Sequence, residues 1–156
     1  MSEPEEVVTH SAEETIAFGR RLGETLHPPL LVLLSGEIGT GKTTLTKGIV
    51  AGLHAASEDD VTSPTFTLVH VYGAIPGTSA RVYHADLYRI ESFPDFLTLG
   101  LEDLFDQPNI AILEWSERFP LKSAWPQLHI RLEHLGSDTR RISLTAYGPS
   151  SSGQAP

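Results

Sequence analysis

A glycine-rich segment between an apolar run and a helix-like stretch constrains the fold of this chain more than any other feature. Residues 36–43 read GEIGTGKT, which matches the phosphate-loop pattern G-x-x-x-x-G-K-[ST]. The run Leu30–Leu34 before it is continuously apolar and too short for a typical helix, so it predicts a strand buried on both faces. After the loop, Leu45, Ile49 and Leu53 recur at helical spacing. The order strand, glycine loop, helix predicts an α/β fold of the P-loop NTPase type.

The glycine loop has the residue types that a triphosphate site needs. Its backbone N–H groups must turn inward toward phosphate oxygens, and we expect a Cβ atom at Gly36 or Gly41 to obstruct that path. Lys42 would place its charge near the β and γ phosphates, and the Thr43 hydroxyl would coordinate Mg²⁺. The next helix would direct its N-terminus at the anion. The residues predicted to bind the nucleotide here are Gly36, Glu37, Ile38, Gly39, Thr40, Gly41, Lys42, Thr43 and Thr44.

The asparagine content of the chain narrows the choice of nucleotide. Asn109 is the only asparagine, so the N-K-x-D signature by which most P-loop GTPases read guanine is impossible. We therefore predict ATP, accompanied by Mg²⁺.

Two carboxylates at predicted strand ends are candidates for the second metal anchor and for orienting the attacking water. Glu114 ends an apolar strand, where a Walker-B carboxylate is expected, and Asp86 ends another β-rich run. We predict that both belong to the Mg²⁺ site with Thr43, and that both act in catalysis with Lys42. The alternative for Asp86 is that it caps a turn or pairs with Arg89.

A hydroxyl-rich segment, Ser63–Thr67 (SPTFT), lies between the predicted loop helix and the strands that follow. Many nucleotide hydrolases have a segment in this place that senses the γ-phosphate, so Thr65 is a candidate catalytic hydroxyl that binds Mg²⁺ or the attacking water. The alternative is an ordinary proline-containing turn that leads into a strand.

The rest of the chain predicts a mixed sheet. Ser11 and Glu14 form a capping-box pattern before a helix expected over 12–27, which Pro28 ends. Further strands are expected, the first two as a hairpin, over 66–72, 81–86, 109–115, 127–133 and 140–147. We expect a three-layer fold with a mixed parallel/antiparallel central sheet in a single domain over 1–147. The small polar residues of 148–156 predict a disordered tail.

Composition limits the partners. The chain has 156 residues, 20 Asp+Glu against 11 Lys+Arg, and a formal charge of −9, which argues against direct binding of nucleic acid. It contains no cysteine, which removes disulfides, thiolate metal sites and cysteine nucleophiles. No apolar run approaches the length of a membrane span, and the N-terminus is acidic where a signal peptide is basic. We expect a cytoplasmic protein that uses no membrane.

Four phrases in this order resemble one known family. The P-loop GEIGTGKTT, the segment VTSPTFTLVHVY, the phrase VYHADLYRI and the strand ILEW are similar to TsaE, the small bacterial ATPase of tRNA threonylcarbamoyladenosine (t6A) biosynthesis. The resemblance spans about Ser11 to Tyr147. It implies a mixed-sheet P-loop fold and a Mg²⁺-dependent ATPase that supports two partners, TsaB and TsaD. Those partners transfer the threonylcarbamoyl group to adenosine 37 of tRNAs that read codons starting with A, so tRNA is met only through the complex.

The resemblance also implies roles for single residues. Thr65 and Thr67 match a switch-like loop, Asp86 matches the carboxylate of the D-L-Y-R phrase, and Glu114 and Trp115 match an E-W pair near the nucleotide. Trp115 thereby joins the predicted nucleotide-binding residues, with simple packing as the alternative.

Two other functions remain open. A small-molecule kinase is possible for a short P-loop protein, although such enzymes usually have a lid with several arginines, and here the only late pair is Arg140 and Arg141. A nucleotide-gated interaction module that hydrolyses ATP negligibly would use the same Thr43, Asp86 and Glu114. The seven histidines have no paired zinc spacing and are expected at the surface or in strands.

Overall fold

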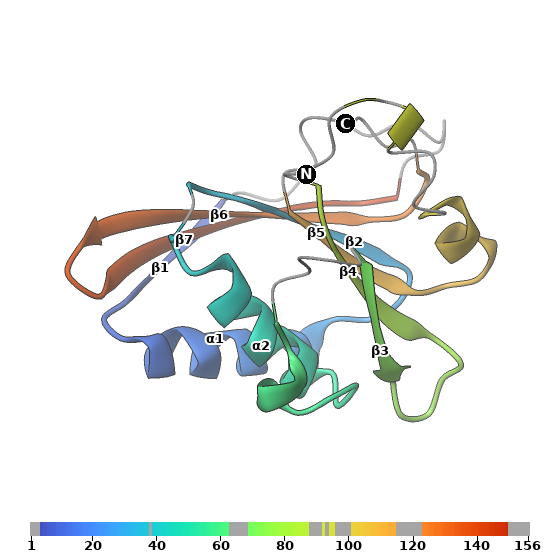
Figure 1. Cartoon of the computed structure of the whole chain (residues 1–156), viewed down its shortest axis with the longest axis horizontal. Coiled ribbons are helices and arrows are strands. Elements are labelled where there is room, and N and C mark those ends of the chain that lie inside the picture. Colours follow the sequence, from blue (N-terminus) through green and yellow to red (C-terminus); the bar gives the residue numbers. More distant parts are fainter. Residues whose placement is uncertain are drawn as a thin grey trace.

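A seven-stranded mixed sheet organises the protein (Figure 1). The computed structural model describes residues 4–37, 39–62, 69–87, 92, 94–95, 101–114 and 123–149. The strands are β1 (Glu5–Thr9), β2 (Leu30–Ser35), β3 (Val69–Ala74), β4 (Arg81–Asp86), β5 (Ile110–Glu114), β6 (Gln127–Gly136) and β7 (Thr139–Tyr147). The helices are α1 (Ala12–Thr25), α2 (Lys42–Gly52) and the 3₁₀ helices η1 (Glu58–Asp60) and η2 (Leu101–Asp106).

The strand order is β1-β7-β6-β2-β5-β4-β3, with β2 at the centre. β2 runs parallel to β5 and β6, and β4 runs parallel to β5. The pairs β3–β4, β6–β7 and β1–β7 are antiparallel. The predicted mixture of parallel and antiparallel strands is therefore confirmed, as is the predicted antiparallel pairing of β3 with β4 at one end of the sheet.

Both faces of the sheet are covered. α1 and α2 lie together on one face (Figure 1), over a core formed mainly by Val32, Leu34, Leu45, Ile49, Val82, Ile112, Ile130 and Ile142. The opposite face carries a smaller core that includes Leu31, Ala85, Leu104, Ala111 and Leu113, with Phe105 and Trp125 packed against it. η2 supplies Leu104 and Phe105 to this second layer, so the expected three-layer arrangement is confirmed.

α1 and α2 meet through glycines. A Cβ atom at Gly48 would lie 2.2 Å from the carbonyl oxygen of Ile16, and one at Gly23 would lie 2.4 Å from that of Ile49. A Cβ atom at Gly52 would lie 2.2 Å from the carbonyl oxygen of Arg20, and one at Gly19 would lie 2.7 Å from that of Leu45. Each helix thus presents a G-x-x-x-G pair that lets the two backbones touch.

The observed elements agree with the expected ranges to within one residue except at β1, α1, β3 and β6. β3 continues to Ala74, two residues past its expected end, and β6 continues to Gly136, three residues past its expected end. α1 ends at Thr25, two residues before the expected end, because Leu26 is already extended. The strand β1 was not predicted; it pairs with β7 in the register Val7↔Ile142. The start of the hairpin strand expected from residue 66, and most of the tail expected from 148, fall outside the described residues. In the part of the chain that is described, no helix is long and apolar enough to cross a membrane.

Candidate functional site

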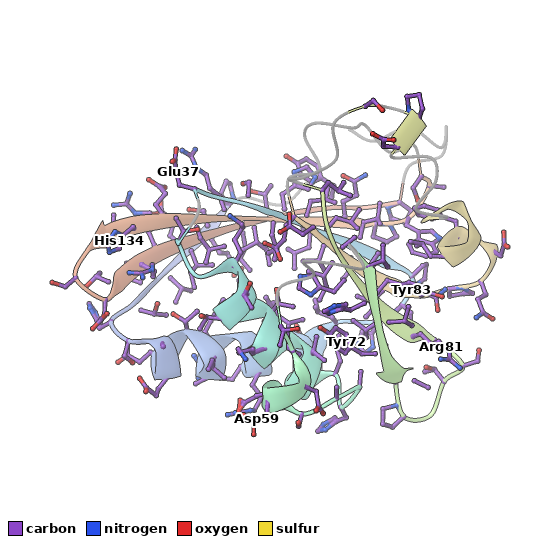
Figure 2. The ribbon with its side chains drawn as sticks, in the orientation of Figure 1. Glu37, Asp59, Tyr72, Arg81, Tyr83 and His134 are labelled. Carbon is purple, nitrogen blue, oxygen red and sulfur yellow. The ribbon has the colours of Figure 1, made fainter. Side chains whose placement is uncertain are left out.

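The glycine loop leaves the sheet at its topological switch point. After β2 the chain goes to β3, β4 and β5 on one side, and then crosses to β6 on the other. Ligands of open α/β sheets bind outside the carboxyl ends of the strands at such a point. In Figure 2 Glu37, just past the end of β2, lies toward the same end of the molecule as His134 of the β6–β7 hairpin and away from Arg81.

Positive φ angles shape the loop at Gly36 (146°), Gly39 (84°) and Gly41 (103°). A Cβ atom at Gly36 would lie 2.7 Å from the carbonyl oxygen of Leu132, so this position has no room for a side chain. At Gly41 the protein atoms nearest to an added Cβ lie 3.8 Å away, so the protein itself leaves space there. Gly41 is required by its left-handed backbone, not by lack of space.

Three side chains brace the loop. The Lys42 ammonium donates to the carbonyl oxygens of Gly36 (2.6 Å) and Glu37 (3.2 Å). The buried Thr40 hydroxyl donates to the Glu37 carbonyl at 2.8 Å. From β7, 100 residues away, Arg140 Nε donates to the Thr40 carbonyl at 2.9 Å. The loop conformation therefore depends on a strand that the motif does not include.

The first turn of α2 begins at the loop without a side-chain cap. Its N-cap is Gly41, which has no side chain that could cap the N–H groups of this turn. Thr43 and Thr44 in this turn are half-buried, whereas Thr46 is buried and donates to the carbonyl of Lys42 at 2.8 Å. Uncapped N–H groups at a helix N-terminus favour an anion, and the accessible hydroxyl of Thr43 suits Mg²⁺.

The two predicted carboxylates stand side by side next to the loop. Asp86 pairs in register with Glu114, and Glu114 pairs with Leu34 on β2, two residues before the loop begins at Gly36. Paired residues of parallel strands direct their side chains to the same face, which here is the face covered by α2. Within the described residues no group of three or more His, Asp or Glu forms a metal cage. One hydroxyl and two carboxylates suit Mg²⁺, because this ion keeps several of its waters.

A histidine that the sequence analysis placed only in general terms contacts Glu114. His84 Nε2 lies 2.7 Å from Glu114 Oε2, and the two side chains are 0% and 4% exposed. His84 lies on β4 two residues before Asp86, on the same face. The expectation that the histidines lie at the surface or in strands holds for its position in a strand, but it missed the contact.

Two further rings from β3 surround His84. Tyr72 stacks on it with the ring centroids 6.4 Å apart and an interplanar angle of 26°, and His70 meets it edge-on at 6.4 Å. The pKa of Tyr72 is raised mainly by burial; a backbone hydrogen bond at Thr62 opposes this, and the nearby charges of Glu114 and Asp60 add to it. Burial lowers the pKa of His70, with a further contribution from His84. Both pKa shifts favour the uncharged forms of Tyr72 and His70.

A surface pocket adjoins the first turn of α2. It lies between the start of α1, the loop and the β6–β7 turn, and its lining residues are Ser11, Ala12, Thr15, Gly41, Thr44, Asp138 and Arg140. Sequence analysis assigned Ser11 only to capping, a role confirmed by its side chain accepting from Glu14 N at 3.0 Å. The pocket brings residues from three distant segments to the edge of the predicted phosphate site.

Three predicted site residues, Ile38, Thr65 and Trp115, lie outside the described residues. The structure brings the others together around the ends of β2, β4 and β5. Of the residues that were missed, His84 had a signal in the phrase VYHADLYRI, where it shares a strand face with Asp86. Arg140 had no local signal, because its contact with Thr40 depends on the fold.

Comparisons with known proteins give one consistent result. A family model described as "Threonylcarbamoyl adenosine biosynthesis protein TsaE" matches residues 9–142. The chain is 38% identical over 141 residues to the TsaE protein of a Nostoc species, with 86% of this chain and 82% of that protein covered. It is 34% identical over 142 residues to TsaE of Bacillus subtilis, covering 90% of this chain and 84% of the relative.

A solved structure agrees with these matches. The crystal structure of YdiB from Bacillus subtilis superposes with a TM-score of 0.67 at 29% identity, and covers 95% of this chain and 88% of that one. The shared fold and the family match over most of the chain lead to one conclusion: the chain belongs to the TsaE family of threonylcarbamoyladenosine biosynthesis.

Proposed function

We propose that this protein binds ATP with Mg²⁺ at the P-loop and hydrolyses it in the cytoplasm, in support of t6A modification of tRNA by TsaB and TsaD. The observation that carries the proposal is the register of the sheet. The P-loop, Glu114 and Asp86 come from three different segments, and they meet at the carboxyl ends of adjacent parallel strands. This arrangement supplies a phosphate cradle and two carboxylates at one edge.

The loop residues fit a triphosphate. The space beside Gly36 admits no Cβ atom, and the first turn of α2 leaves its N–H groups without a side-chain cap. The Lys42 ammonium donates to the loop carbonyls of Gly36 and Glu37, and we propose that it turns from them toward phosphate oxygens when the nucleotide binds. Thr43 and, through water, the two carboxylates would hold Mg²⁺, which supplies positive charge against the phosphates. Glu114 or Asp86 would orient the attacking water.

The pocket beside Thr44 supports a place for the rest of the nucleotide. It begins at the first turn of α2 and extends to Ser11 and Asp138, which offer hydroxyl and carboxylate groups to a sugar or base. We propose that the nucleoside part of ATP occupies it.

The charge balance supports an indirect relation to tRNA. A net charge of −9 does not favour binding to a phosphate backbone. We therefore propose that the protein contacts tRNA only indirectly, through the TsaB–TsaD complex. The family assignment to threonylcarbamoyladenosine biosynthesis supports these partners.

A single-turnover assay tests the proposal. The protein, alone and with TsaB and TsaD, is mixed with radiolabelled ATP and Mg²⁺, and release of phosphate is followed. We expect slow release by the protein alone and a changed rate with the partners. Lys42→Ala should abolish nucleotide binding, while the matched control Lys47→Ala, which removes a lysine bonded to the carbonyl of Val61, should retain it. Glu114→Ala should spare binding more than turnover.

Two results would favour the alternatives. Hydrolysis that never exceeds the background of the Lys42→Ala protein would favour a nucleotide-gated module. A phosphorylated metabolite found by mass spectrometry after incubation with ATP and metabolite pools would favour a kinase. In a host that depends on this protein, unchanged t6A after Lys42→Ala would refute the role of ATP in the modification.

A further inference from the structure

The contact between His84 and Glu114 is the strongest unexplained feature of the site. The side chains are 0% and 4% exposed, and Nε2 and Oε2 are 2.7 Å apart. An ionised Glu114 can only accept a hydrogen bond, so Nε2 donates to Oε2 in this contact. Its Nδ1 is buried and has no hydrogen-bond partner in the described part of the chain. The ring therefore has one polar contact there, and that contact is with Glu114.

The surroundings of the pair are apolar. The register partner of His84 on β5 is Ile112, and Val82 lies two residues earlier on the same strand face; both are fully buried. Apolar residues of similar volume often replace such buried polar pairs with no loss of stability, or with a gain. Stability therefore does not explain why a histidine occupies this position. A role in holding the neighbouring carboxylate does explain it.

The ring itself is held from the other side. Tyr72, labelled on β3 in Figure 2, stacks on His84. The ring of His70 meets both of these rings edge-on, with its centroid 6.2 Å from that of Tyr72 and 6.4 Å from that of His84. His70 is also the register partner of His84. A ring packed in this way cannot swing out, so its N–H group is directed at one carboxylate oxygen.

We propose that His84 is a positioning residue, whose Nε2–H restrains one oxygen of Glu114 and leaves the other, Oε1, for the nucleotide edge of the sheet. Oε1 makes no hydrogen bond to the residues that the structure describes. The β3–β4 hairpin thereby sets the orientation of a carboxylate that belongs to β5. This inference rests on the proposed ATPase function for its catalytic consequence, but not for the geometry of the pair.

Two substitutions at one position separate positioning from packing. His84→Gln keeps a side-chain N–H donor at a reach similar to Nε2, while His84→Leu keeps an apolar body and removes the donor. We expect His84→Leu to lower kcat about 10- to 100-fold, the range for groups that orient ligands from behind. ATP affinity, measured by equilibrium binding, should change by less than about threefold, and His84→Gln should recover most of kcat. In a Glu114→Gln background, His84→Leu should add no further loss of kcat.

A matched control removes a similar contact elsewhere. His129 Nε2 lies 2.8 Å from Gln127 Oε1 on β6, so His129→Leu also deletes a ring hydrogen bond, and we expect it to leave kcat unchanged. The positioning role is overturned if His84→Leu hydrolyses ATP at the wild-type rate. It is equally overturned if His84→Gln is as impaired as His84→Leu, because the donor would then be irrelevant.

A spectroscopic readout does not depend on turnover. The ¹⁵N shifts of the His84 ring in the nucleotide-free protein report its tautomer, and we expect Nε2–H with a shift change on Glu114→Gln. An Nδ1–H tautomer, or rings insensitive to that substitution, would overturn the inference. If the wild-type protein fails to hydrolyse ATP above the Lys42→Ala background, the proposed function fails, while the tautomer still decides whether His84 holds Glu114.

Discussion

The packing of α1 on α2 predicts an unusual sign for the substitution Gly48→Ala. In an open helix this change stabilises by about 1 kcal/mol, because glycine is the poorer helix former. Here the added Cβ would lie 2.2 Å from Ile16 O, 2.9 Å from Arg20 N and 3.0 Å from Gly19 Cα. The shortest of these is more than 1 Å below an ordinary contact distance of about 3.5 Å. All three are backbone atoms, so no side-chain rotation relieves the overlap.

The helices must therefore separate. Overpacking of a well-packed interface costs about 1–3 kcal/mol, and a rigid backbone contact places Gly48→Ala at the upper end, about 3 kcal/mol. Subtracting the gain of about 1 kcal/mol in helix propensity leaves a net destabilisation of about 2 kcal/mol. For a chain of this size that lowers Tm by roughly 4–8 °C.

Urea and thermal denaturation followed by circular dichroism measure this change. The matched control is Glu24→Ala, an exposed position on α1, for which we expect a change within about 0.5 kcal/mol. A Gly48→Ala protein as stable as the wild type, or more stable, would refute the close packing of the two backbones.

Three further predictions concern the cap of α1, a partly buried histidine on β6 and the brace of the glycine loop. Ser11→Ala removes the hydroxyl that accepts a first-turn N–H at 3.0 Å, and should lower the free energy of unfolding by about 1 kcal/mol in urea titration; an unchanged value would contradict the cap. Burial lowers the pKa of His129 below 6.5, so the unfolded chain takes up that proton first. Stability should then fall as the pH drops below about 6.5, and His129→Gln should flatten this dependence; equal slopes would contradict it. Arg140→Ala removes the donor to Thr40 O and should weaken ATP binding about three- to tenfold. The control Arg141→Ala, which removes an ion pair with Glu6, should leave the affinity for ATP unchanged. Equal affinities of the two variants would contradict the prediction.

Local sequence patterns were sufficient to predict most of the fold. The apolar run of β2, the glycine loop and the helical spacing of α2 each depend on neighbours within a few residues, and all three are confirmed. β1 was missed because its five residues, EEVVT, are mostly exposed and give no clear alternation. That strand forms because β7, more than 130 residues later in the chain, offers it an edge.

The candidate site likewise contains some residues that could be predicted from local sequence and others that could not. Lys42, Thr43, Asp86 and Glu114 could be chosen from motif and strand ends, since their positions follow from the ends of predicted elements. The brace from Arg140 to Thr40 spans 100 residues and could not be chosen. The paired G-x-x-x-G segments of α1 and α2 were visible in the sequence, but their meaning was not, because a glycine pair shows nothing of the surface it faces.

The sequence by itself determined a strand, a phosphate-type loop and a helix in that order, with two carboxylates at later strand ends, and a resemblance to TsaE that the comparisons confirm. Only the tertiary structure decided that His84 restrains Glu114, that Arg140 braces the loop, and that Ser11 and Asp138 line a pocket beside it. The reason is physical. Backbone geometry and hydrophobic periodicity act over a few residues and can be read along the chain, whereas hydrogen bonds between side chains of distant strands exist only after the sheet has set their register.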